Sequence, residues 1–265
     1  MIKTPVRPKA FDVLVASALT TACLGMAPLE AAEPPDVRTT SEYIAAKDGT
    51  RLAVDVHLPG GLGDGTRLPA LLVYTRYWRS SEDAQTGEPL PALAPLDRQF
   101  LANGYAVVKA DARGSGASFG SRPTEYGHQE VRDGYDIVDW IARQPWSDGK
   151  VGAYGTSYTG TTAELLAATE HPALRAVIPG WSDFDDYLSP SRPYGLVASA
   201  FIRLWGQYVG WQDENNVEQL GESVRRVDGD DDGSLLAAAL AEHAANPDVF
   251  EVVSAAKFRD DAYQG

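Results

Sequence analysis

The stretch Val151-Gly-Ala-Tyr-Gly-Thr-Ser157-Tyr-Thr-Gly160 places a serine between two glycines, one two residues before it and the other three after it, which is the G-x-S-x-G pattern with one extra residue before the second glycine. Residues 150–154 are typical of a short buried strand, and the run 161–169, rich in alanine and leucine, is typical of a helix. Small residues around the serine let a strand turn sharply into a helix, and the strained turn exposes the hydroxyl. The stretch therefore predicts a nucleophile elbow, with Ser157 as the nucleophile.

Strand and helix patterns alternate around this elbow. The sequence predicts an antiparallel hairpin over 41–58, buried strands at 69–74, 105–110 and 175–179, and helices at 95–103 and 129–143. Such alternation favours an α/β fold, in which a mostly parallel sheet is flanked by helices.

The pattern changes after Gly180. Residues 194–211 are aromatic and apolar at helical spacing, 227–233 form an acidic glycine-rich turn, 234–245 form an alanine-rich helix, and another helix is expected to open at Pro247. We therefore expect three parts: a leader over 1–32, an α/β part over 33–180, and an all-helical segment over 181–265.

Four ordered stretches support a resemblance to a known family. They are Lys47-Asp-Gly-Thr-Arg-Leu-Ala-Val-Asp-Val-His-Leu-Pro59, Asn103-Gly-Tyr-Ala-Val-Val-Lys-Ala-Asp-Ala-Arg-Gly-Ser-Gly-Ala-Ser118, Asp139-Trp-Ile-Ala-Arg-Gln-Pro-Trp-Ser-Asp-Gly149 and Gly155-Thr-Ser-Tyr-Thr-Gly160. From Ser41 to Arg192 the chain resembles the cocaine-esterase and X-Pro dipeptidyl-peptidase-like serine hydrolases, a branch of the α/β-hydrolases. The resemblance implies a helical cap over the active site and cleavage of ester or amide bonds through an acyl-enzyme on Ser157. It implies no metal and no cofactor.

The same resemblance implies an oxyanion hole with two donors. One is the backbone N–H of Tyr158, and the other is the hydroxyl of a tyrosine just beyond the third strand, which we assign to Tyr77 with Tyr74 as the alternative. The family usually has a proline before this tyrosine, whereas Arg76 stands there in this chain. Tyr77 could instead be an interfacial aromatic residue beside Trp78.

A serine hydroxyl also needs a base and an acid that orients the base. In this fold the acid and the histidine follow the serine, and the resemblance places both after the cap. We therefore expect the chain to be the N-terminal part of such an enzyme, incomplete at its C-terminus, with Ser157 necessary but not sufficient. His171 and His243 are expected at the surface. The alternative is a catalytically silent remnant, or a fragment that only binds ligands.

Three aspartates follow the strand that ends near Pro179. Asp183, Asp185 and Asp186 could orient a base, could bind a substrate amine as in the related α-amino-acid ester hydrolases, or could form a solvated loop. We name Asp185, Asp186 and Trp181 as candidate substrate-binding residues. Asp111 and Arg113 are expected to pair with each other as part of the architecture. Aromatic cap residues predict either a pocket for bulky apolar acyl groups or a cap core; they are Trp181, Tyr187, Tyr194, Trp205, Tyr208 and Trp211.

The charge composition limits which classes of partner are expected. A net charge of −14 with scattered basic residues argues against nucleic acid and anionic membranes. The expected partner is a small ester, amide or peptide, and the oligomeric state stays open.

The first residues are typical of a bacterial secretory signal. Basic Lys3, Arg7 and Lys9 precede a mostly apolar run over 13–29, and small residues follow, which predicts cleavage near Ala32 and a secreted or periplasmic protein. The alternatives are a frayed cytosolic N-terminus or a lipoprotein signal at Cys23. No later apolar run reaches the roughly twenty residues that a membrane span needs.

Overall fold

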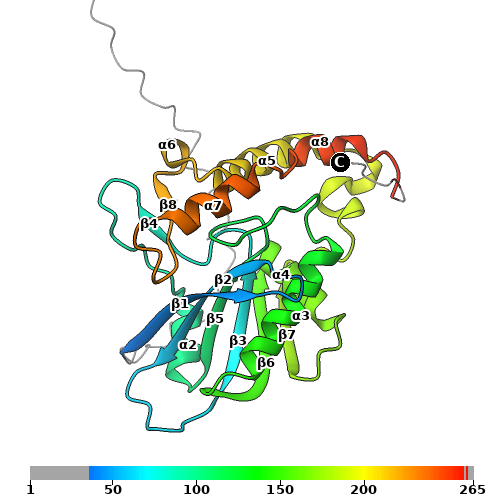
Figure 1. Ribbon diagram of the computed structural model, residues 1–265. Helices are drawn as coiled ribbons and strands as arrows, with labels where there is room; N and C mark the ends of the chain where they lie inside the picture. Colours follow the sequence, from blue (N-terminus) through cyan, green and yellow to red (C-terminus); the bar gives the residue numbers. More distant parts are fainter. Residues whose placement is uncertain (1–35, 260, 262–265) are drawn as a thin grey trace, which may run out of the picture. The chain divides into compact units, whose positions relative to one another are not determined.

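The alternating pattern of the sequence produces a six-stranded sheet with the strand order β1-β2-β5-β3-β6-β7 (Figure 1). A computed structural model describes residues 36–259 and 261. The expected signal peptide, with Cys23, lies outside these residues. The described residues all belong to one compact unit, Pro34–Gly265.

The sheet is antiparallel at one side and parallel at the other. The expected hairpin is confirmed, with β1 (Val37–Ala45) and β2 (Arg51–Pro59) antiparallel and Gly49 at positive φ in the turn. β2 pairs antiparallel with β5, and the remaining neighbours are parallel. Their bounds are β3 Leu68–Thr75, β5 Ala106–Asp111, β6 Ser147–Thr156 and β7 Leu174–Gly180.

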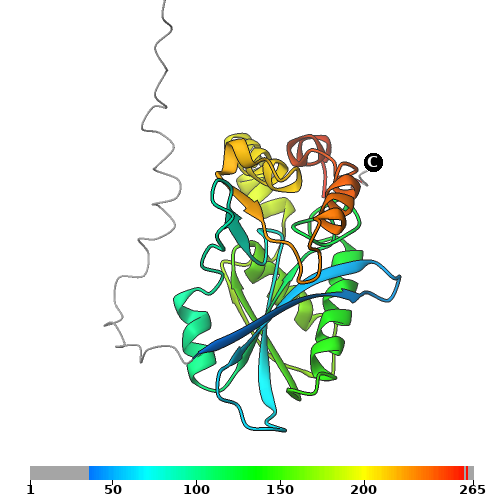
Figure 2. The same cartoon turned by 60° about the vertical axis from the view of Figure 1, so that its left-hand side comes forward.

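Helices cover both faces of this sheet. α2 (Pro95–Ala102) lies on one face, while α3 (His128–Ala142) and α4 (Tyr158–Ala167) lie on the other (Figures 1 and 2). The central strands read as continuous apolar runs because they are buried on both sides. Among the described strands β7 forms an edge, and its Ile178 is 62% exposed.

The residues after Gly180 gather at the carboxyl ends of the parallel strands (Figures 1 and 2). This cap segment contains the short turns η1 (Tyr187–Ser191) and η2 (Pro193–Gly195), and four α-helices: α5 Ser199–Asp213, α6 Val217–Leu220, α7 Ser234–His243 and α8 Val249–Ala255. None of the helices in the described part is long and apolar enough to cross a bilayer.

The expectation that this segment is wholly helical was wrong. β8 (Glu222–Val224) pairs antiparallel with β4 (Ser81–Asp83), so a ribbon joins the cap segment to the chain after β3. A strand of three residues carries too short a pattern to be recognised, and its partner lies far away in the sequence.

The expected pairing of Asp111 with Arg113 was also wrong. The buried carboxylate of Asp111 instead binds Arg79, whose Nη1 lies 3.0 Å away and whose Nε lies 2.8 Å from Asp55. Arg113 follows the end of β5, where the chain turns toward α3, and its Nε lies 2.7 Å from Asp133. The two residues therefore belong to separate ion pairs.

Candidate active site

Ser157 lies between β6 and α4 in a strained conformation. Its φ and ψ are 60° and −127°, and its side chain is exposed. Such a backbone costs about 1–3 kcal/mol in a non-glycine residue and persists only where the surroundings enforce it. Here the Ser157 N–H donates to the carbonyl of Gly180 at 2.9 Å, and the Ser157 carbonyl accepts from Thr161 N–H at 2.9 Å. The predicted elbow is therefore present.

The two glycines of the motif are required by close packing. A Cβ on Gly160 would lie 2.1 Å from the carbonyl oxygen of Gly180, which belongs to β7. A Cβ on Gly155 would lie 2.3 Å from the hydroxyl oxygen of Thr159. Both distances are shorter than any non-bonded contact allows, so β6, α4 and β7 can meet around Ser157 only with glycine at these positions.

Gly160→Ala should therefore destabilise the elbow strongly. The obstacle is backbone, which cannot rotate away, so we expect a loss of about 3 kcal/mol or more in the free energy of unfolding, measured by urea denaturation. Gly210→Ala is the matched control: its Cβ would meet nothing within 4 Å in helix α5. That substitution should be neutral or stabilising by up to about 1 kcal/mol, and equal losses in both variants would contradict the packing argument.

Aromatic rings surround the serine. Tyr158 is buried, its hydroxyl donates to Glu130 Oε1 at 2.5 Å, and its ring stacks on Tyr126 at 4.4 Å between centroids. Tyr77 packs edge-on against Tyr158 at 5.7 Å. Because α4 begins at Tyr158, the N–H of that residue is among the free donors of the first helical turn.

Tyr77 is the tyrosine that reaches the serine. It lines the same cavity as Ser157, and its oxygen accepts a hydrogen bond from Trp205 Nε1 at 2.9 Å. Burial raises the pKa of Tyr77, while the hydrogen bond from Trp205 and the positive charge of Arg76 act in the opposite direction. Tyr74, the alternative, is buried on the α3 side, where its hydroxyl donates to the carbonyl of Glu130 at 3.3 Å.

Glu130 was not singled out from the sequence. Burial, followed by the charge of Glu125, raises its pKa to about 7. It holds the Tyr158 hydroxyl and also accepts from Tyr126 N–H at 3.0 Å, so it fixes the aromatic floor beneath the serine. The sequence did contain a signal for this role, because Glu130 is an acidic residue on the inner face of an amphipathic helix.

A cavity of about 140 Å³ opens beside Ser157. One wall is apolar and comes from the cap segment, whereas acidic side chains line another part. The apolar wall includes Phe201, Ile202, Trp205, Val249, Val252 and Val253, and the acidic groups are Glu125, Asp183, Asp186 and Asp213. Of the six aromatic cap residues named from the sequence, Trp205 alone lines it.

The three candidate substrate-binding residues are placed differently. Asp186 lines the cavity; burial, with the charges of Asp183 and Asp185, raises its pKa to about 7, and its Oδ1 has no hydrogen-bond partner among the described residues. Asp185 pairs with Arg259 and accepts from Tyr187 N–H at 3.1 Å. Trp181 is 60% exposed and does not line the cavity, so its contact with substrate stays a prediction.

The expected surface positions of the two later histidines were wrong. His171 is buried with its Nε2 3.6 Å from Asp139, and His243 is buried with Nε2 2.7 Å from the carbonyl oxygen of Ser118. A helix end next to proline and an alanine-rich helix suggested exposure, but both histidines face the body of the protein. None of the four histidines, all within the described residues, hydrogen-bonds to Ser157.

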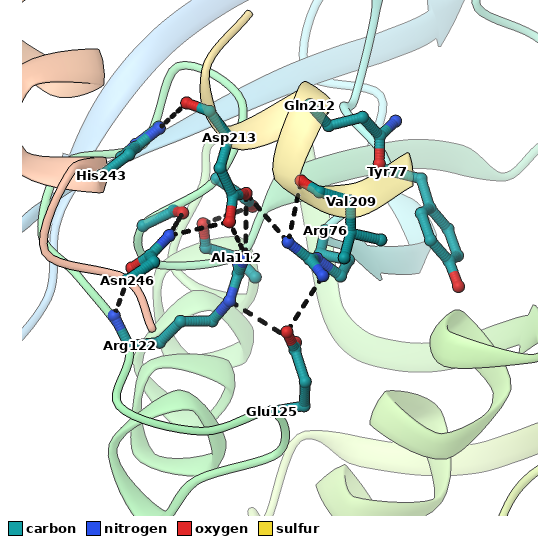
Figure 3. Close-up of polar contacts among 12 residues, drawn as sticks. Arg76, Tyr77, Ala112, Arg122, Glu125, Val209, Gln212, Asp213, His243 and Asn246 are labelled. Carbon is teal, nitrogen blue, oxygen red and sulfur yellow. Dashed lines mark hydrogen bonds and ion pairs between the residues drawn. The ribbon is translucent and has the colours of Figure 1, made fainter. Parts of the chain in front are cut away.

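A buried charge network joins the cap segment to the sheet near the cavity (Figure 3). Arg76 places its guanidinium 2.9 Å from both Glu125 and Asp213. Arg122 lies 2.9 Å from Asp213, and Asn246 Nδ2 donates to the same carboxylate at 3.0 Å. Asp213 ends α5, so this network holds α5 against the segments that follow β3 and β5.

Known proteins resemble this chain in sequence. A Mycobacterium bovis protein that carries a provisional name as a serine esterase is 42% identical over 242 residues, which cover 85% of this chain and 38% of the relative. The cocaine esterase of a Rhodococcus species is 32% identical over 63% of this chain and 28% of the relative. The chain thus spans less than two fifths of the length of these relatives.

Solved structures resemble this chain in fold. A CocE/NonD family hydrolase from Staphylococcus aureus superposes with a TM-score of 0.58 at 26% identity, over 70% of this chain and 35% of that one. An α-amino acid ester hydrolase gives a TM-score of 0.52 at 27% identity, over 71% of this chain and 33% of that one. The sheet is therefore an α/β-hydrolase sheet. Residues 48–265 match the family described as X-Pro dipeptidyl-peptidase (S15 family), and the chain belongs to this family of hydrolases.

Proposed function

We propose that Ser157 is the nucleophile of a serine hydrolase that cleaves ester or amide bonds through an acyl-enzyme. The observation that carries the proposal is the strained, exposed Ser157 in the same cavity as Tyr77. The Ser157 Oγ attacks the substrate carbonyl carbon while a base accepts its proton, and the carbonyl oxygen becomes an oxyanion. The N–H of Tyr158 and the hydroxyl of Tyr77 donate to this oxyanion; the alcohol or amine then leaves, and water hydrolyses the ester on Ser157.

The contacts of Ser157 do not include a catalytic base. None of the four histidines, all of them described, hydrogen-bonds to Ser157. We therefore propose that the base is a group that does not contact Ser157 in this structure, and that the described residues supply only the nucleophile and the oxyanion hole. The alternative is a silent remnant, in which the site no longer binds a reacting carbonyl.

Adding free imidazole distinguishes a site that lacks only its base from a silent remnant. Without it, an aryl phosphonate should modify Ser157 barely faster than any exposed serine, as measured by intact-protein mass spectrometry. With imidazole in the cavity as the base, the rate should rise at least about tenfold, because general bases contribute 10²–10⁴-fold. Ser157→Ala should show no adduct at this position. If imidazole has no effect on the rate of the parent protein, the site is a remnant.

The acidic part of the cavity supports a substrate with an amine. One solved relative is named as an α-amino acid ester hydrolase, and α-amino acid esters carry an ammonium group beside the ester. Asp186 lines the cavity and has a buried oxygen, Oδ1, without a hydrogen-bond partner among the described residues, and the apolar wall of the cap segment suits a bulky apolar group. We therefore propose that Asp186 binds the ammonium group, with Asp185 and Trp181 at the outer edge of the site.

This proposal predicts a pH dependence of ligand binding. The pKa of Asp186 is about 7, so its carboxyl is mostly neutral at about pH 6 and mostly charged at about pH 8. Phenethylamine stays a cation over this range, so its affinity, measured by calorimetry, should rise about fivefold to tenfold with pH. In Asp186→Asn the rise should vanish, and the uncharged analogue phenethyl alcohol should show none. A rise that persists in Asp186→Asn would contradict the assignment.

We further propose that the leader over 1–32 exports the protein. N-terminal sequencing of protein recovered from the periplasm or medium should then begin close to residue 33. An intact N-terminus in the cytosol would argue against export.

A further inference from the structure

We propose that Trp205 is a positioning residue of the oxyanion hole, because its indole N–H fixes the direction in which the Tyr77 hydroxyl donates. The inference rests on the proposed function, since it assigns a role within the same site. It concerns a side chain of the cap segment that does not itself need to touch the reacting atoms.

The hydrogen bond between the two side chains has only one possible direction. An indole nitrogen is a donor and never an acceptor, so Trp205 Nε1, at 2.9 Å, donates to the oxygen of Tyr77. A phenolic hydrogen lies close to the plane of its ring and has two positions there. The Trp205 N–H takes the lone pair on one side of the oxygen, and the hydroxyl hydrogen of Tyr77 must point to the other side.

The ring of Tyr77 is itself held in place. The backbone N–H of Tyr77 donates to the hydroxyl of Thr75 at 2.8 Å. The ring of Tyr77 packs against Tyr158 at 5.7 Å and against Tyr208 at 6.4 Å between centroids. With the ring fixed, the direction of the hydroxyl is the remaining freedom, and Trp205 removes it. The hydroxyl is then ready to donate within the cavity that Ser157 shares.

Arg76 holds the tryptophan in position. Its guanidinium lies 5.5 Å from the Trp205 ring, and its Nη2 donates to the carbonyl of Val209 at 3.4 Å, one helical turn further along α5. The ion pair of Arg76 with Asp213 fixes the end of the same helix (Figure 3). Since Tyr77 is the next residue in the chain, the oxyanion donor and the anchor of its partner helix share one rigid turn after β3.

Accepting a hydrogen bond also makes the Tyr77 hydroxyl a better donor. In a chain of hydrogen bonds each member polarises the next, by perhaps 10–30% per bond. Such a preorganised donor needs no reorientation when charge develops on the substrate oxygen, which is the condition under which oxyanion donors are most effective. The cap segment thereby contributes to the oxyanion hole through a single side chain, Trp205.

The test measures the ionisation of residue 77 without any catalysis. Difluorotyrosine placed at position 77 gives fluorine NMR signals whose titration reports the pKa of the phenol. Trp205→Phe keeps an aromatic ring at this position but removes the indole N–H. Because that N–H stabilises the phenolate, the pKa of the probe should rise by about one unit. Trp211→Phe, on the same helix and outside the cavity lining, is the matched control and should leave it unchanged. An unchanged pKa in Trp205→Phe, or equal shifts in both variants, would overturn the proposal.

A double-mutant cycle then separates positioning from packing. Trp205→Phe should slow imidazole-supported phosphonate labelling of Ser157 about tenfold when Tyr77 is present, and less than twofold in the Tyr77→Phe background. Equal losses in both backgrounds would show that Trp205 acts through packing alone. If the parent protein shows no imidazole-supported labelling, the proposed function fails, while the fluorine titration still decides the role of Trp205.

Discussion

Replacing Tyr77 by phenylalanine should abolish the imidazole-supported acceleration of Ser157 labelling, because losing one oxyanion donor usually costs about 10²–10³-fold. A phosphonate that reacts with the serine passes through a state in which negative charge collects on an oxygen. The hydroxyl of Tyr77 lies in the cavity where that oxygen must be placed, and the N–H of Tyr158 then remains as the other donor. The measurement is the second-order rate constant of labelling, followed by mass spectrometry.

Tyr208→Phe is the matched control for this substitution. The Tyr208 ring contacts Tyr77 at 6.4 Å, but its hydroxyl accepts from Gln212 Nε2 at 3.2 Å and lies outside the cavity lining. We expect its rate to change less than about threefold, because the oxyanion donors are unaltered. A Tyr77→Phe protein that keeps its melting temperature and labels at the parent rate would remove Tyr77 from the oxyanion hole.

The parts of the fold that the sequence predicted are those decided by local pattern. The elbow could be predicted because the glycines on both sides of Ser157 reflect a packing requirement between adjacent elements, as the contacts of Gly155 and Gly160 show. The six strands of the main sheet and the helices α2, α3 and α4 matched because each is a run of apolar residues with one period. The helix expected at 194–211 instead begins at Ser199, because Tyr194 has a positive φ and is fully exposed.

The features that were missed depend on residues far apart in the chain. The β4–β8 ribbon, the burial of His243 against Ser118 and the sharing of Asp213 by two arginines each join segments separated by more than ninety positions. Periodicity and spacing carry no information at that range. Arg76 was visible as a departure from the family's proline, but only the structure shows that its side chain reaches Glu125 and Asp213.

Asp213→Asn should cause the largest loss of stability. The carboxylate of Asp213 neutralises Arg76 and Arg122, whose side chains are 0% and 5% exposed. Burial favours the neutral form of Asp213, yet these two arginines hold its pKa below the usual value, so the charged form is the one that the fold requires. Removing one partner of a buried ion pair costs about 3–5 kcal/mol, because the remaining charge stays buried and unpaired. We expect a loss of that size in urea unfolding.

The loss of stability in Asp213→Asn should be concentrated in helix α5. α5 carries Asp213 at one end and Trp205 near its middle, and Glu125 alone would remain to balance two arginines. Amide hydrogen exchange should therefore rise throughout α5 in Asp213→Asn, while β3 and β6 stay protected. Glu214→Gln is the control, since this neighbouring side chain is exposed and should change the stability by less than about 0.5 kcal/mol. If Asp213→Asn instead unfolds with the parent's midpoint, the two arginines find other compensation, and the network cannot be what holds α5 over Ser157.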